Sequence, residues 1–124
     1  MDNLNCRAYT SLGHLRYLSC LKYVDLVVGN SSSGLAEVPT FKTPTINVGD
    51  RQKGRLRAKS VIDCLPISQN ISFAIQKALS NEFQDTLHHC SNPYGEGGSS
   101  EKVVRLIESI DPIDNVKKEF YDFD

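Results

Sequence analysis

Residues 25–49, DLVVGNSSSGLAEVPTFKTPTINVG, decide the fold class of this chain. The apolar run over residues 25–28 is typical of a parallel strand covered on both faces, and Gly29 stops it. A short helix over residues 33–41 and a second buried strand over residues 45–48 follow. Strand, glycine-bearing turn, short helix and strand in this order indicate a right-handed βαβ unit. They predict an α/β fold.

The segments on either side extend this unit. Upstream, Ser11 can cap a helix whose apolar positions recur every three residues, at Leu12, Leu15, Leu18 and Leu21. Downstream, the pattern predicts a strand over residues 60–64, a helix from Ser68, a short helix over residues 82–90 and a final helix over residues 99–110. The expected architecture is a Rossmann-like open parallel sheet with flanking helices.

Length and charge exclude several classes of protein. A chain of 124 residues forms one small domain, which we assign to residues 1–110, followed by a polar tail over residues 111–124. Fourteen basic and fifteen acidic side chains give a net charge of -1, too little to recruit nucleic acid or an anionic membrane. No apolar run approaches the roughly 18 residues that span a bilayer. The polar N-terminus lacks the apolar core of a signal peptide.

The cysteines agree with a cytoplasmic location. They are Cys6, Cys20, Cys64 and Cys90, widely spaced and without a C-x-x-C pair. We therefore interpret them as reduced, mostly buried thiols. His88 and His89 stand next to the last of them, but neighbouring side chains on a helix point about 100° apart, which is unfavourable for chelation. We expect no metal site and no cofactor.

The turn over residues 29–34, GNSSSG, is the first candidate site. Ligands of parallel sheets bind at the carboxyl ends of the strands, and this turn follows such an end. Glycine lets the backbone approach a ligand closely, while serine hydroxyls and the first helical amides supply donors for a phosphate. The alternative is a polar turn whose serines only cap the helix. Neither G-x-G-x-x-G nor a Walker lysine is present, so a dinucleotide site and a P-loop are disfavoured.

Two further features lie near this turn. Glu37, three residues after Gly34 and in the expected first helical turn, can accept hydrogen bonds from two ribose hydroxyls. Its alternative role is a carboxylate that the helix dipole favours. The loop after the second strand carries four basic residues that could neutralise a diphosphate or could simply be solvated: Arg51, Lys53, Arg55 and Arg57.

These motifs together resemble the C-terminal part of UDP-N-acetylglucosamine 2-epimerases. The hydrolysing branch, which serves sialic acid and capsule synthesis in bacteria, is the most similar. The resemblance runs in order through GNSSSG at 29–34, Glu37, Pro39, TPTINVG at 43–49, RQKGR at 51–55 and NPYGEG at 92–97. The last motif and the helix over residues 99–110 are similar to the closing loop and crossover helix of the family.

The resemblance implies a fold and a set of contacts. Members have two Rossmann-like domains facing a cleft, as in the two-domain glycosyltransferases of the B type, and this chain would be part of the C-terminal one. By resemblance, Ser31 and Ser32 hold the diphosphate of UDP, Glu37 takes the ribose and Arg51 contacts the nucleotide. The backbone of Leu12 meets the uracil. Further candidates are Ser33, Gly34 and Arg55, whereas His14 is interpreted as a surface or packing residue.

The implied reaction starts with removal of the proton at carbon 2 of the sugar and loss of UDP. Water then adds to the 2-acetamidoglucal intermediate, and N-acetylmannosamine leaves. The proton-transfer groups of the family come mainly from the missing N-terminal domain and the front of this one, and nothing in this sequence supplies them. We therefore expect no catalytic residue in this chain and no turnover by it alone. Expected partners are UDP or UDP-N-acetylglucosamine, the missing domain and further copies of the chain.

Three alternatives stay open. The first is a non-hydrolysing epimerase, although the serine run over residues 30–34 and the stretch over residues 51–55 favour the hydrolysing branch. A nucleotide-sugar glycosyltransferase has a similar fold, but many retaining members carry a second glutamate where this chain has Thr45. The last alternative is a catalytically inactive, truncated fragment that binds UDP weakly or not at all. The apolar stripe of the final helix, together with an unpaired sheet edge, predicts self-association.

Overall fold

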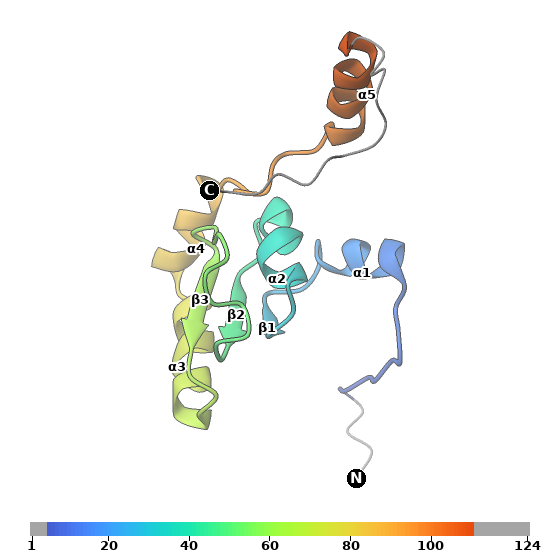
Figure 1. Ribbon diagram of the computed structural model, residues 1–124. Helices are drawn as coiled ribbons and strands as arrows, with labels where there is room; N and C mark the ends of the chain where they lie inside the picture. The colour runs from blue at the N-terminus through green and yellow to red at the C-terminus, as the bar shows by residue number, and fades with distance from the viewer. Residues whose placement is uncertain (1–4, 111–124) are drawn as a thin grey trace, which may run out of the picture.

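The computed structural model describes residues 5–110 and has an open parallel sheet at its centre (Figure 1). The three strands are β1 (Val27–Gly29), β2 (Thr45–Val48) and β3 (Val61–Cys64), in the order β1-β2-β3. All pairs are parallel, with Val28 opposite Ile46 and Ile46 opposite Ile62. The predicted α/β fold with an open parallel sheet is confirmed. The expected polar tail over residues 111–124 lies outside the described residues.

Helices precede, connect and follow the strands, and those that pack on the sheet confirm the predicted flanking layers. They are α1 (His14–Cys20), α2 (Ser33–Ala36), the 3-10 helix η1 (Val38–Phe41), α3 (Ser68–Ala78), α4 (Asn81–His88) and α5 (Ser99–Ser109). Figure 1 shows α3 and α2 on opposite sides of the strands. Alternation along β2 produces this arrangement, because successive side chains of a strand point to opposite faces. The βαβ prediction thus gives both the sheet and its covering layers.

The two faces of β2 are packed differently. On the α3 face, Ile46 forms a buried cluster with Ala74 and Ala78. On the α2 face, Thr45 lies so close to Gly34 that a Cβ there would come within 2.7 Å of the threonine Cγ2. The Thr45 hydroxyl also donates to the Gly34 carbonyl at 3.0 Å. Glycine is therefore required at this position for the close approach of α2 to the sheet.

The first helix differs from its prediction. It begins at His14, and Gly13 in the left-handed region (φ 68) precedes it, so Ser11 does not cap it. Instead the Ser11 hydroxyl accepts a hydrogen bond from the Gly13 amide at 3.1 Å. No residue of α1 is buried, and Leu15 is 79% exposed. The leucine spacing is helical, but the stripe is covered unevenly, because Leu21, directly after the helix, is only 3% exposed.

Two other boundaries also differ. The expected helix over residues 33–41 is divided into α2 and η1, with Glu37 at the junction rather than in a first helical turn. Pro39 explains the division, because it lacks the amide that would continue the α-helix. In β1, Val28 is 46% exposed, so this edge strand is not covered on both faces. The buried cluster of the α3 face does not extend over it.

Helix α5 stands apart from the sheet in Figure 1, after a loop in which three glycines have positive φ. None of its residues is buried. Its apolar side chains are all more than half exposed: Val103, Val104, Leu106, Ile107 and the following Ile110. Self-association through this surface stays a prediction. Among the described helices, none is both long and apolar enough to cross a membrane.

Candidate functional site

The turn after β1 is built from local hydrogen bonds. Gly29 ends the strand at the carboxyl edge of the sheet. The Ser31 hydroxyl accepts from the Ser33 amide at 3.3 Å, and the Ser31 carbonyl accepts from the Gly34 amide at 3.2 Å. Ser32 occupies the N-cap position of α2 without a side-chain cap bond. The serines therefore shape the turn through one hydroxyl and the backbone.

A cavity of about 420 Å³ opens between this turn and α1. Two segments that are far apart in sequence line it: Ser11, Leu12, Gly13, His14 and Tyr17 on one side, and Ser31, Ser33 and Glu37 on the other. The cavity lies just beyond the carboxyl end of β1, where ligands of parallel sheets bind. Its lining is mostly polar side chains, with a single leucine.

Two polar contacts join the walls of this cavity. The hydroxyls of Tyr17 and Ser33 share a hydrogen bond of 2.6 Å. The Nε2 of His14 lies 3.6 Å from the Oε1 of Glu37, a distance that permits an ion pair but not a hydrogen bond. His14 is exposed, as expected, and it also faces the carboxylate. Tyr17 was missed, although its position one helical turn after His14 could have indicated it.

The structure brings together some of the candidate residues and not others. Leu12, Ser31, Ser33 and Glu37 line the cavity. The remaining candidates are outside its lining: Ser32, Gly34, Arg51 and Arg55. Gly34 is buried and packs against Thr45, which accounts for it without a ligand. The proposed nucleotide contacts of all these residues stay predictions.

The basic loop divides into free and engaged side chains. Arg57 donates from Nη1 to the Arg55 carbonyl at 2.7 Å and from Nη2 to the Gln52 carbonyl at 3.1 Å. Its Nε lies 2.7 Å from the Oδ2 of Asp63, an ion pair whose direction is not that of a hydrogen bond. The guanidinium of Arg57 thus serves the protein itself, whereas Arg51 is exposed at the start of the loop.

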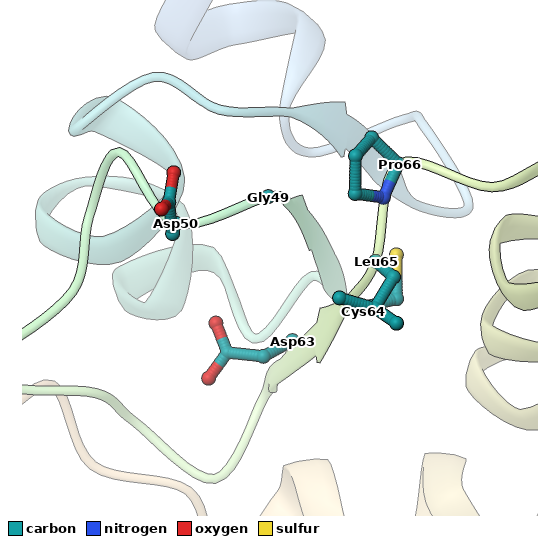
Figure 2. A pocket seen from close by; sticks show the side chains of 6 residues that line it. All are labelled: Gly49, Asp50, Asp63, Cys64, Leu65 and Pro66. Atoms are coloured by element: carbon teal, nitrogen blue, oxygen red, sulfur yellow. The ribbon is translucent and has the colours of Figure 1, made fainter.

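A second cavity, of about 460 Å³, lies at the carboxyl ends of β2 and β3 (Figure 2). It is lined by Gly49, Asp50, Asp63, Cys64, Leu65 and Pro66. Figure 2 shows the Asp63 carboxylate and the Cys64 thiol directed to opposite sides of β3. Burial raises the pKa of the Cys64 thiol above its ordinary value, and the charge of Asp63 raises this pKa further.

The cysteines differ from the expectation in their burial. Cys90 is buried and Cys64 is partly buried, but Cys6 and Cys20 are exposed, so the expectation of mostly buried thiols was wrong for these two. All four are free. Within residues 5–110, no group of three or more histidine, cysteine or acidic side chains is arranged to hold a metal ion.

The sheet topology defines a Rossmann-like α/β domain, and the first cavity lies at the carboxyl edge of its sheet. The family model described as UDP-N-acetylglucosamine 2-epimerase matches residues 1–108. The chain belongs to this family.

Three curated proteins are similar in sequence to this chain. Polysialic acid biosynthesis protein P7 of Escherichia coli is 44% identical over 108 residues, which are 86% of this chain and 27% of the relative. The GDP/UDP-N,N'-diacetylbacillosamine 2-epimerase (hydrolyzing) of Campylobacter jejuni is 46% identical over 78 residues, 63% of this chain and 20% of the relative. A UDP-N,N'-diacetylbacillosamine 2-epimerase (hydrolyzing) of Legionella pneumophila is 33% identical over 110 residues, which are 89% of this chain and 28% of the relative. The chain spans about a quarter of the length of these relatives.

Proposed function

We propose that this chain is the UDP-binding part of a hydrolysing UDP-N-acetylglucosamine 2-epimerase of sialic acid or capsule biosynthesis. The cavity between α1 and the turn after β1 receives the nucleotide. One observation carries the proposal. Leu12, Ser31 and Glu37, which come from two separate segments, line a single cavity at the carboxyl edge of the sheet. The printed names of the relatives, which include hydrolysing 2-epimerases, support the reaction class.

Each side of the cavity suits a different part of UDP. In the proposal, the backbone of Leu12 meets the uracil, and the Ser31 hydroxyl donates to the diphosphate. Glu37 can accept hydrogen bonds from both ribose hydroxyls. The His14 imidazole is 3.6 Å from the Glu37 carboxylate, too far for a hydrogen bond, so it does not occupy either carboxylate oxygen. Ser32 and Arg51 complete the diphosphate contacts in the proposal.

In the whole enzyme, this part would act on the leaving group. Loss of UDP after removal of the proton at carbon 2 concentrates negative charge on the diphosphate. Donors fixed in advance around that charge lower the barrier, since they need no reorganisation during the reaction. The groups that move protons lie outside this chain in the proposal. The chain alone therefore binds UDP and does not turn over UDP-N-acetylglucosamine.

Isothermal titration of the purified chain with UDP, UMP and ADP tests the nucleotide proposal. We expect UDP to bind more tightly than UMP, and ADP to bind weakest. Glu37→Gln keeps the shape of the side chain but loses its charge, so UDP affinity falls about tenfold or more, given about 1.5–3 kcal/mol for a hydrogen bond to a charged group. Glu101→Gln, in the exposed first turn of α5, is the matched control and leaves affinity unchanged.

Two results would contradict this proposal. Equal affinity of the wild-type chain for UDP and ADP removes the uridine preference. Unchanged UDP affinity in Glu37→Gln removes the ribose contact. A separate assay for N-acetylmannosamine with the chain alone tests the division of labour, and any turnover shows that the chain holds its own proton-transfer groups.

A further inference from the structure

A connected set of polar contacts runs from β3 to the turn after β1. On the sheet, the Asn47 side-chain amide donates to Asp63 Oδ1 at 2.6 Å, and Asp63 Oδ2 lies 2.7 Å from Arg57 Nε. Arg57 then donates to the Gln52 carbonyl, and Gln52 Nε2 donates to the Asn30 carbonyl at 2.8 Å. The contacts therefore bridge the carboxyl ends of all three described strands.

Burial sets these contacts apart from ordinary surface polarity. Asn47 is 1% exposed and Gln52 is 3% exposed. Among the described residues, Asn47 Oδ1 and Gln52 Oε1 have no hydrogen-bond partner. Each side chain nevertheless uses its amide nitrogen to hold another segment, β3 for Asn47 and the turn for Gln52, so an apolar replacement would leave that partner without its bond.

We infer that Asn47, Asp63, Arg57 and Gln52 form a loop clamp that fixes residues 50–57 against the turn over residues 29–34. The clamp acts on the diphosphate end of the site through Arg51, which is exposed at the start of the same loop. This inference rests on the proposed UDP site. Its members are positioning residues, because Arg57 directs its guanidinium to two carbonyls and a carboxylate of the protein.

The geometry of the guanidinium explains why an arginine holds this position. Two of its nitrogens reach the carbonyls of Arg55 and Gln52 while the third faces Asp63. A lysine keeps the positive charge but lacks the planar fork that reaches both carbonyls at once. Gly49, directly before this loop, and Gly54 within it have positive φ (80° and 81°), and because glycine has no Cβ, the backbone gains wide conformational freedom once the clamp is released. Ordering a released loop on binding then costs affinity.

Titration of the full chain with UDP and with uridine tests the clamp. Arg57→Lys is expected to weaken UDP binding about tenfold and uridine binding less than about twofold, because only the diphosphate meets the clamped loop. Arg105→Lys on exposed α5 is the matched control and changes neither affinity. Gln52→Met, similar in length but without the donor to Asn30, reproduces the Arg57→Lys pattern. Thermal unfolding of each variant confirms that it is folded.

A double-mutant cycle separates positioning from general destabilisation. In an Arg51→Gln background, Arg57→Lys is expected to cause no further loss of UDP affinity, because its effect passes through Arg51. An undiminished loss in that background, an equal loss for uridine, or wild-type UDP affinity in Arg57→Lys overturns the clamp. The proposed site is tested by the wild-type titration alone.

Hydrogen exchange keeps the clamp testable even if the wild-type chain binds no UDP. Amides of Arg55 and Gly34 are hydrogen-bonded in the loop and in the turn, respectively. Arg57→Lys should accelerate exchange at both sites while the amides of β2 stay protected. Acceleration at Arg55 alone shows that the loop and the turn are not coupled and overturns the inference.

Discussion

The sheet with its covering helices and the outer helices of this chain are held by different forces. In the sheet region, Ile46 and Ala78 are fully buried and Leu35 is 1% exposed. In α1 and α5, no residue is buried. The proposed nucleotide cavity has one wall from each kind of region, since the turn after β1 leads into α2 and the other wall is α1.

This difference predicts unequal rigidity across the cavity. A fully buried aliphatic side chain contributes about 1.5–3 kcal/mol, whereas one hydrogen bond contributes about 0.5–1.5 kcal/mol. The turn is anchored through α2 on the sheet. The C-terminal end of α1 is held by buried Leu21, but its cavity-lining part meets the turn through polar contacts, the Tyr17–Ser33 bond and the approach of His14 to Glu37. We therefore expect a fixed diphosphate side and a uracil side that opens at low cost.

Matched isoleucine substitutions give the largest expected contrast between the two regions. Ile46→Ala removes a fully buried side chain and should lower the free energy of unfolding by about 2–5 kcal/mol. Ile107→Ala removes the same atoms from a position that is 63% exposed, so the change should stay within about 0.5 kcal/mol. Urea unfolding of both variants measures the difference. Similar losses would show that α5 packs on the rest of the chain in solution.

Gly34→Ala tests the anchoring of the turn. The new Cβ would meet Thr45 Cγ2 at 2.7 Å, and overpacking of this kind costs about 1–3 kcal/mol. Thr45→Ser removes that methyl and keeps the hydroxyl that donates to the Gly34 carbonyl. Combined with Gly34→Ala, it should restore most of the lost stability. Thermal denaturation reports both effects, and a double variant no better than the single one would place the strain elsewhere.

Tyr17→Phe addresses the weaker wall. It removes the hydroxyl that bonds Ser33 and should release α1 by about 0.5–1.5 kcal/mol, seen as faster hydrogen exchange of the α1 amides. The amides of β2 should not change. Tyr23→Phe, at an 87% exposed position just after the helix, is the control. Unchanged exchange in Tyr17→Phe would mean that other contacts hold α1.

The sequence predicted the elements whose signal is local. The run over residues 45–48 was expected as a strand and has these bounds in β2, and the helix from Ser68 begins there in α3. The helix over residues 33–41 failed at Pro39, whose effect on the backbone is also local and was underestimated. The leucine spacing predicted the helix α1 but not the exposure of its residues, because burial depends on which other elements pack against the helix.

For the candidate site, the limit is long-range geometry. Ser31 and Glu37 were predictable because a short turn places them at one strand end. Two hydrogen bonds of the site join segments that are distant in sequence: Tyr17 with Ser33, and Gln52 with Asn30. No local pattern in a single sequence predicts such a contact. Arg57 was grouped with the diphosphate-neutralising residues, since only the folded chain shows that its guanidinium is already engaged.

The smallest expected effect concerns a cysteine from each region. Burial and Asp63 raise the pKa of Cys64, so the folded chain keeps this thiol protonated at a pH where the unfolded chain has begun to ionise. The contribution of the neutral thiol to the free energy of unfolding is therefore complete below the pKa of the unfolded chain. It is lost as the pH rises through the raised pKa of the folded chain.

Alkylation measures this difference. Because the thiolate is the reactive form, iodoacetamide should modify Cys64 more slowly in the folded chain than in urea, and its rate profile should be displaced to higher pH. Exposed Cys20 should react at similar rates in both. Mass spectrometry of the two peptides measures this, and equal folded and unfolded rates at Cys64 would show that the edge of the sheet is open to solvent there.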